Sequence, residues 1–155
     1  MIESDAMQIV IACKNLSKQK VGALIVFRRG DDLRNVEITG ETINANISTR
    51  LIQNIFFKNS PLHDGAMIIG DGKIISVGCI LPVSHSLNVP KECGLRHRAA
   101  LGMSEKYDAL CVIVSEETGN ISVAMYGDLK LNITPEDLES ILSKGEYKRE
   151  SSKSV

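Results

Sequence analysis

Tryptophan is absent from this chain of 155 residues, and aromatic residues make up only 4% of it. A hydrophobic core must therefore be built mainly from Ile, Val, Leu, Met and Ala. Apolar residues reach 43%, as in a typical globular domain, which excludes disorder over most of the chain. An excess of positive charge is also missing, because the formal net charge is −1. This balance argues against a duplex-binding protein and leaves only a local phosphate pocket as a site for polyanions.

Cysteine pairs with metal-binding or redox spacing are missing too. The four cysteines form no C-x-x-C pair, and none lies near a histidine at zinc-finger spacing. Cys13, Cys79 and Cys111 lie in apolar runs, so we expect them to be buried as small hydrophobic residues. Cys79 lacks a cationic neighbour, which makes it a poor nucleophile. Free thiols are typical of a reducing cytosol.

Long apolar stretches are likewise missing. Residues 1–7 are acidic and polar, unlike the apolar core of a signal peptide, and no run is long enough to cross a bilayer. We therefore expect a soluble, cytoplasmic chain.

The pattern of apolar residues predicts a single α/β domain over residues 1–144, followed by a polar, disordered tail over 145–155. We expect helices over residues 6–17, 48–58, 95–106 and from 134 onward. We expect strands over 22–28, 65–70, 73–81, 109–115, 121–126 and 129–133, and a short edge strand through Val36 and Ile38 to Gly40. The hairpin signal Asp71-Gly72 requires antiparallel pairing. A mixed, twisted β-sheet with helices on both faces follows from this order.

Polar residues at three places could carry chemistry, and the first is Pro61–Ala66, which leads into a buried strand. In one interpretation it is only a turn, with Asp64 bonded to its own backbone. In the other, His63 and Asp64 lie beside a metal–phosphate site, because imidazole and carboxylate both ligate divalent ions. Gly65 and Ala66 would then let a ligand approach the backbone.

The second place is Gly94–Ala100, where a glycine leads into a helix with a cationic first turn. The helix dipole disfavours such cations by about 0.3–1 kcal/mol each. A bound polyphosphate would reverse this, since it could accept from backbone N–H groups and guanidinium groups together. A solvated basic helix start is the alternative. Arg96 and Arg98 differ by about 200° around a regular helix, so both cannot face one phosphate, and one of them is structural or reaches a partner subunit.

The third place is Ser115–Gly119, after another buried strand. It reads either as a tight turn with solvated acids or as the source of two ligand contacts, Ser115 and Glu116. Three such segments converging on one rim would make a ligand site.

Taken in order, these segments resemble the diadenylate cyclase family, whose catalytic unit is the DisA-type or DAC domain. The shared features are Asp-Gly-Ala at 64–66, Arg-His-Arg at 96–98 and Ser-Glu-Glu at 115–117. The likeness spans nearly the whole chain. It is similar in particular to the membrane-tethered CdaA-type cyclases, which implies that the full-length protein is anchored to the cell membrane by an N-terminal region not present here.

The resemblance implies a nucleotidyltransferase that condenses two ATP into cyclic di-AMP and two pyrophosphates, with Mg²⁺ or Mn²⁺, in a face-to-face homodimer or a higher homo-oligomer. It implies catalytic roles for Asp64, Arg96, His97 and Arg98. It implies ATP contacts from Gly65, Ala66, Ile80, Leu81, Leu95, Ser115 and Glu116, with adenine against Ile80-Leu81 and partly recognised by backbone groups. It implies metal contacts from His63, Asp64 and Glu116.

Two positions depart from the family pattern. Many members carry Thr where this chain has Leu95, and Tyr where it has Ile80. A hydroxyl contact and a stacking ring are replaced by aliphatic groups. An alternative function is therefore a non-catalytic adenine-nucleotide-binding regulatory domain of the same fold. A dimerisation module without a ligand is a further alternative, which the intact His63, Asp64, Arg96 and Arg98 disfavour.

Overall fold

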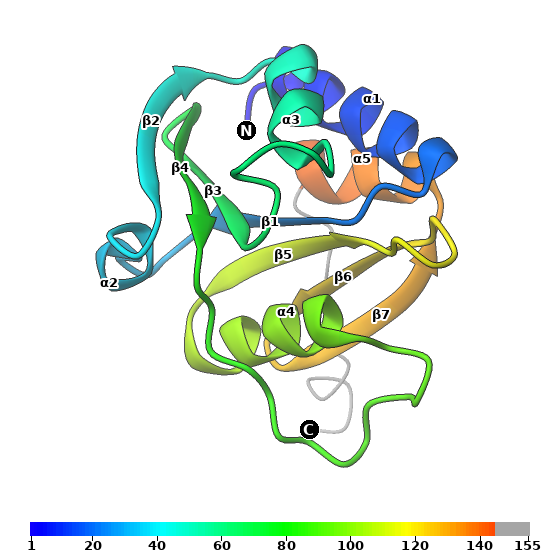
Figure 1. Cartoon of the computed structure of the whole chain (residues 1–155). Coiled ribbons are helices and arrows are strands. Elements are labelled where there is room, and N and C mark those ends of the chain that lie inside the picture. The colour runs from blue at the N-terminus through cyan, green and yellow to red at the C-terminus, as the bar shows by residue number, and fades with distance from the viewer. Residues whose placement is uncertain (145–155) are drawn as a thin grey trace.

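The computed structural model describes residues 1–144, which form a mixed sheet of seven strands packed between helices (Figure 1). In chain order the elements are α1 (Glu3–Gln19), β1 (Ala23–Arg28), α2 (Arg34–Glu37), β2 (Glu41–Asn46), α3 (Thr49–Phe56), β3 (Ala66–Gly70), β4 (Lys73–Cys79), α4 (Leu95–Lys106), β5 (Ala109–Val114), β6 (Ile121–Met125), β7 (Asp128–Ile133) and α5 (Pro135–Lys144). The predicted α/β class, with a mixed sheet covered on both faces, is confirmed. The predicted tail over 145–155 lies outside the described residues.

The strand order is β2-β4-β3-β1-β5-β6-β7. β1 pairs in parallel with β3, whereas each of the other neighbouring pairs is antiparallel. The predicted hairpin is present, with Asp71 and Gly72 at positive φ between β3 and β4. This order places the start of β1 beside the start of β3 and the end of β5, and that edge of the sheet carries the site described below.

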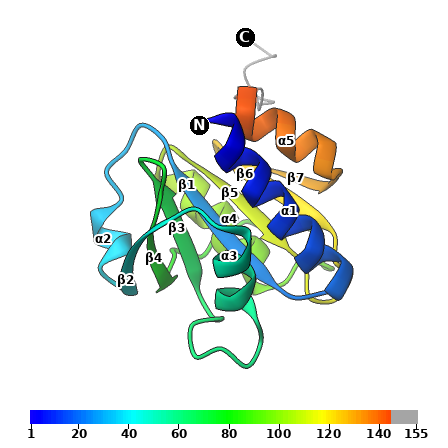
Figure 2. The same cartoon turned by 90° about the horizontal axis from the view of Figure 1, so that it is seen from above.

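Two hydrophobic clusters lie on opposite faces of the sheet. α1, α3 and α5 cover one face, while α4 covers the other and α2 lies at its edge (Figure 2). Because side chains alternate along a strand, β5 supplies both clusters. Leu110, Val112 and Val114 pack with α1, α3 and α5, whereas Ala109, Cys111 and Ile113 pack with α4.

Capping residues fix the helix starts that the sequence predicts. The Ser48 side chain accepts a hydrogen bond from the Leu51 N–H at 3.3 Å. At α5, the Asp137 N–H donates to Thr134 Oγ1 at 3.0 Å and the Thr134 N–H donates to Asp137 Oδ2 at 3.2 Å, which is a reciprocal capping pair. Both caps satisfy N–H groups that have no partner inside the helix.

The edge strand predicted through Val36 and Ile38 is wrong. This stretch forms the short helix α2, in which Val36 is buried while Ile38 is exposed. Asp32 Oδ1 accepts from the Arg34 N–H at 2.8 Å and favours the helical start. The strand at this edge of the sheet is β2, in which only Ile43 and Ala45 are partly buried and the other four residues are exposed.

Cys13, Cys79 and Cys111 are buried, as predicted. Burial raises the pKa of the Cys13 thiol to about 12 and also raises the pKa of Cys79 and Cys111, which makes these thiols inert. Across residues 1–144, none of the helices combines the length and the apolar character that a bilayer crossing requires.

Candidate functional site

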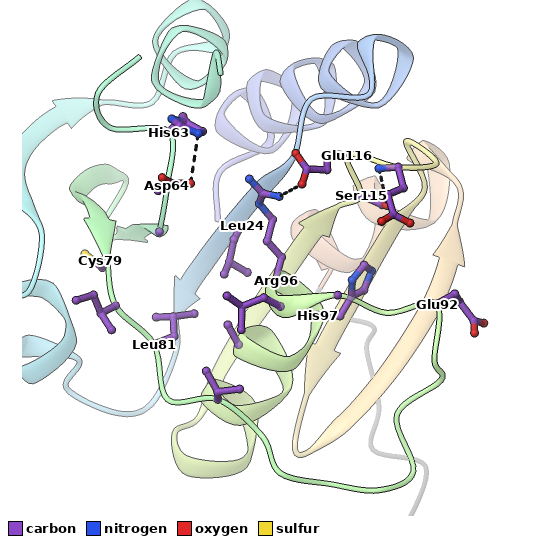
Figure 3. Close-up of a pocket in the computed structure, with 17 residues that line it drawn as sticks. Leu24, His63, Asp64, Cys79, Leu81, Glu92, Arg96, His97, Ser115 and Glu116 are labelled. Atoms are coloured by element: carbon purple, nitrogen blue, oxygen red, sulfur yellow. Dashed lines mark hydrogen bonds and ion pairs between the residues drawn. The ribbon is translucent and has the colours of Figure 1, made fainter. Parts of the chain in front are cut away.

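A cavity of about 630 Å³ opens on the α4 side of the sheet (Figure 3). β1 and β3 begin at it, and β4 and β5 end at it. Its volume lies within the range of about 300–1,000 Å³ that is usual for small-molecule sites. All three of the segments singled out in the sequence reach this cavity. The predicted residues that line it are His63, Asp64, Gly65, Ile80, Leu81, Leu95, Arg96, His97, Ser115 and Glu116.

His63 and Asp64 form one wall, on the connection between α3 and β3. His63 Nδ1 lies 2.9 Å from the Ser60 carbonyl oxygen. A carbonyl can only accept, so Nδ1 carries a hydrogen and donates. Nε2 is then directed at Asp64 Oδ1, 3.3 Å away, while the Asp64 carboxylate itself is 86% exposed (Figure 3). The carboxylate therefore faces solvent and His63 rather than closing its own turn.

This pair fits a divalent cation in a limited way. With Nδ1 protonated, Nε2 offers either a second proton or a lone pair to the gap beside Asp64. Mg²⁺ commonly takes one or two protein carboxylates and completes its shell with phosphates and water. The predicted set of His63, Asp64 and Glu116 is not assembled, because within residues 1–144 no three or more His, Cys, Asp or Glu side chains are grouped to hold a metal. Glu116 is paired with Arg96 instead.

Gly65 lets the backbone of this wall lie against the end of β4. Its φ is +87°, and a Cβ there would come within 2.7 Å of the Cys79 carbonyl oxygen. A side chain at this position would therefore push the wall away from the sheet. Ala66, predicted as an ATP contact, is fully buried at the start of β3 and is not part of the cavity lining.

The start of α4 forms the opposite wall. Arg96 Nη1 lies 3.5 Å from Glu116 Oε1, so an ion pair joins α4 to the loop after β5 (Figure 3). His97 is buried, and burial, followed by the positive charge of Arg96, lowers its pKa. His97 is therefore neutral near pH 7. A cationic arginine beside a neutral histidine is suited to binding a phosphate group.

Arg98, predicted to be catalytic, is not part of the cavity lining. Its Nη1 donates to the carbonyl oxygens of Ser86 at 3.0 Å and Ser84 at 3.4 Å, and the Ser84 N–H donates to the Arg98 carbonyl at 2.9 Å. Arg98 thus holds the connection between β4 and α4. Its separation from Arg96 around the helix explains why only one of the two arginines reaches the cavity.

The loop after β5 is both a turn and a part of the cavity. Ser115 Oγ accepts from the N–H groups of Glu117 at 3.2 Å and Thr118 at 3.3 Å. Its hydroxyl hydrogen can still donate to a ligand. The two interpretations of this segment are therefore compatible.

The end of β4 supplies an apolar wall. Ile80 and Leu95 are each 72% exposed, while Leu81 is buried. The Ile80 N–H donates to Thr39 Oγ1 at 2.8 Å, so this backbone group already has a partner within the protein. Several lining residues were not predicted from the sequence: Leu24, Cys79, Val83, Glu92, Gly94, Ala99 and Glu117. Gly94, Ala99 and Glu117 belong to segments that the sequence singled out, whereas Leu24, Cys79, Val83 and Glu92 come to the cavity through tertiary packing.

Comparison with known proteins agrees with this geometry. Residues 10–129 match the sequence model of the DAC family, described as the nucleotide-binding domain of the DisA bacterial checkpoint controller. The chain belongs to this family. As a DAC domain it contains all three polar segments within the matched residues.

Curated relatives of this DAC domain include the cyclic di-AMP synthase CdaA of Bacillus subtilis, which is 44% identical over 91% of this chain and 51% of the relative. A diadenylate cyclase of Listeria monocytogenes is 46% identical over 83% of this chain and 47% of the relative. The DAC domain thus spans about half the length of these two relatives.

Solved structures share the fold. A crystal structure of a double mutant of DacA from Staphylococcus aureus matches with a TM-score of 0.91 and 42% identity, over 94% of this chain and 97% of that one. A protein from Bacillus cereus, described as a hypothetical membrane-spanning protein, matches with a TM-score of 0.79 and 44% identity, over 83% of this chain and 63% of that one.

Proposed function

We propose that this DAC domain condenses two ATP molecules into cyclic di-AMP and releases two pyrophosphates. The observation that carries the proposal is the meeting of three polar segments around one cavity: His63-Asp64, Arg96-His97 and Ser115-Glu116. Family membership and relatives named as diadenylate cyclases support the same reaction.

Each polar group has a distinct task in that reaction. The exposed carboxylate of Asp64 would accept the proton of the attacking ribose 3′-OH. Arg96 would bind the triphosphate through its guanidinium, and the Ser115 hydroxyl would donate to a phosphate oxygen. His97 is neutral because burial and the charge of Arg96 lower its pKa, so the positive charge beside the phosphate would come from Arg96. Phosphoryl transfer depends mainly on such positioning and charge stabilisation.

Mg²⁺ or Mn²⁺ would be held by His63 Nε2 and Asp64 Oδ1, with phosphate oxygens and water as its other ligands. When bound, the cation would supply positive charge to the triphosphate and the leaving pyrophosphate. Glu116 could coordinate the cation only if its ion pair with Arg96, at 3.5 Å, were broken.

The product contains two nucleotides, whereas we assign one ATP to the cavity of each chain. The second ATP would be presented by a second copy that faces this cavity. Apolar side chains of Ile80 and Leu95 are exposed at the cavity wall, as expected of a surface that another copy covers. A lone copy is then inactive, because in-line attack needs both half-sites.

Attachment of a longer protein to a membrane is a separate prediction.

The test is formation of cyclic di-AMP from ATP with Mn²⁺ or Mg²⁺, followed across protein concentration. Activity per subunit is expected to rise with concentration, and Asp64→Asn is expected to lower turnover by at least about 100-fold. Glu136→Gln is the matched control, since it removes one exposed carboxylate charge in α5, on the opposite face of the sheet. ATP binding without product at any concentration would refute the cyclase and favour the non-catalytic regulatory domain.

A further inference from the structure

Gly22, which precedes β1 and lies outside the three polar segments, lies against the Arg96 guanidinium. A Cβ built on Gly22 would come closer than 3.0 Å to three atoms, all from that guanidinium: Cζ, Nη1 and Nη2. The planar group therefore packs face-on against the backbone at position 22. No side chain could occupy this place while Arg96 keeps its position.

The conformation of Gly22 does not itself require glycine. Its φ is not positive, unlike that of Gly65, so alanine could adopt the same backbone. The obstacle to a side chain is the far end of Arg96. An added methyl group would therefore displace a flexible side chain and leave the fold intact.

A second contact holds the same guanidinium. Glu116 Oε1 lies 3.5 Å from Arg96 Nη1. The loop that carries Glu116 is fixed to the end of α1, where the Ser17 hydroxyl donates to the Gly119 carbonyl oxygen. The junction between α1 and β1 thus meets both Arg96, through Gly22, and the Glu116 loop, through Ser17.

We propose that Gly22 is a positioning residue that confines the Arg96 guanidinium beside the cavity before the nucleotide binds. An arginine side chain loses much rotamer freedom when it is fixed, so confining it in advance lowers the cost of binding. The proposal deepens the proposed function, on which it rests, because it assumes that Arg96 binds the triphosphate.

The test is a double-mutant cycle of Gly22→Ala and Arg96→Ala, read out as the dissociation constant of 3′-deoxy-ATP with Mg²⁺ by calorimetry. This analogue lacks the 3′-OH and cannot be cyclised. Gly22→Ala is expected to weaken binding about tenfold or more in the wild-type background. In the Arg96→Ala background it is expected to weaken binding no more than about twofold, because the group it displaces is gone. Equal losses in both backgrounds, or no loss in the wild type, would overturn the proposal.

Nitrogen-15 NMR of the Arg96 Nε–H group gives a readout that needs no nucleotide, with the resonance assigned by its absence in Arg96→Ala. We expect a restrained side chain in the wild type and an averaged one in Gly22→Ala, at an unchanged melting temperature. A wild-type Arg96 as mobile as in the variant would also refute the positioning role. A wild type that binds no 3′-deoxy-ATP and makes no product would refute the proposed function, and the NMR comparison would still decide the role of Gly22.

Discussion

Substituting Gly102 in the middle of α4 should reverse the usual effect of a helix glycine. Alanine at an ordinary helix position is favoured over glycine by about 1 kcal/mol. At Gly102, however, a Cβ would lie 2.7 Å from the Ser84 nitrogen and 2.8 Å from the Pro82 carbonyl carbon, and nearest of all to the Pro82 carbonyl oxygen. These are backbone atoms, which cannot rotate away as a side chain could.

The expected magnitude follows from the size of this overlap. The Ser84 nitrogen is about 0.7 Å inside the 3.4 Å limit of ordinary contact, so the segment from Pro82 to Ser84 must move off the helix. That movement strains the hydrogen bond from the Ser84 N–H to the Arg98 carbonyl, now 2.9 Å long. Overpacking of this kind costs about 1–3 kcal/mol. After the helix-propensity gain of about 1 kcal/mol is subtracted, Gly102→Ala is expected to destabilise the protein by up to about 2 kcal/mol, where an ordinary helix position would gain stability.

Urea unfolding measures the free-energy change, and amide hydrogen exchange at Ser84 measures the local effect. We expect faster exchange at Ser84 in Gly102→Ala. Gly94→Ala is the control for exchange, because a Cβ at Gly94 would meet no atom within 4 Å, although loss of the glycine cap should still cost about 1 kcal/mol. A Gly102→Ala protein that is about 1 kcal/mol more stable than the wild type, with Ser84 exchange unchanged, would show that the backbone of Pro82 and Ser84 does not obstruct a side chain at position 102.

Three further predictions concern groups elsewhere in α4 and in the core. Burial, and then the charge of Arg96, lowers the folded-state pKa of His97, so the unfolded chain binds more protons below the ordinary histidine value of about 6.5. The contribution of His97 to stability should therefore be fully present above that pH and be lost as the pH falls below it toward the lowered folded-state pKa. The unfolding free energy should then fall more steeply with pH than in His97→Gln, and identical slopes would contradict this. Arg98→Met should speed proteolysis or exchange of the β4–α4 connection with at most a small change in Kd for 3′-deoxy-ATP, whereas a loss of affinity as large as that of Arg96→Ala would place Arg98 at the nucleotide after all. Leu138→Ala, at a fully buried position of α5, should cost about 2–5 kcal/mol in unfolding free energy, and a change below about 1 kcal/mol would mean that α5 is not part of the cooperative core.

Much of the fold could be predicted because its signals are local. Dense apolar runs predicted the central strands, and Ser48 and Thr134 predicted the starts of α3 and α5 through caps that the structure contains. The prediction failed where local signals pointed the wrong way. Val36 and Ile38 alternate like a half-buried strand, yet only Val36 is buried, while the polar β2 is a strand because β4 offers it an edge to pair with.

For the site, the sequence predicted which segments meet but not how each side chain is used. The strand order that joins these segments is a property of the whole sheet, and it explains why Leu24 and Val83 reach the cavity without any motif to mark them.

Arg96 and Arg98 show which part of the site the sequence predicts and which part depends on the fold. Helix geometry alone establishes that the two arginines point in different directions. Which one faces the cavity depends on the connection between β4 and α4, whose carbonyl groups at Ser84 and Ser86 bind Arg98 and leave Arg96 to meet Glu116. The two guanidinium groups consequently differ in surroundings although they are two residues apart. The Arg98 guanidinium donates to backbone carbonyl groups and stabilises the β4–α4 connection. The Arg96 guanidinium has an ion-pair partner, Glu116, that a triphosphate could replace.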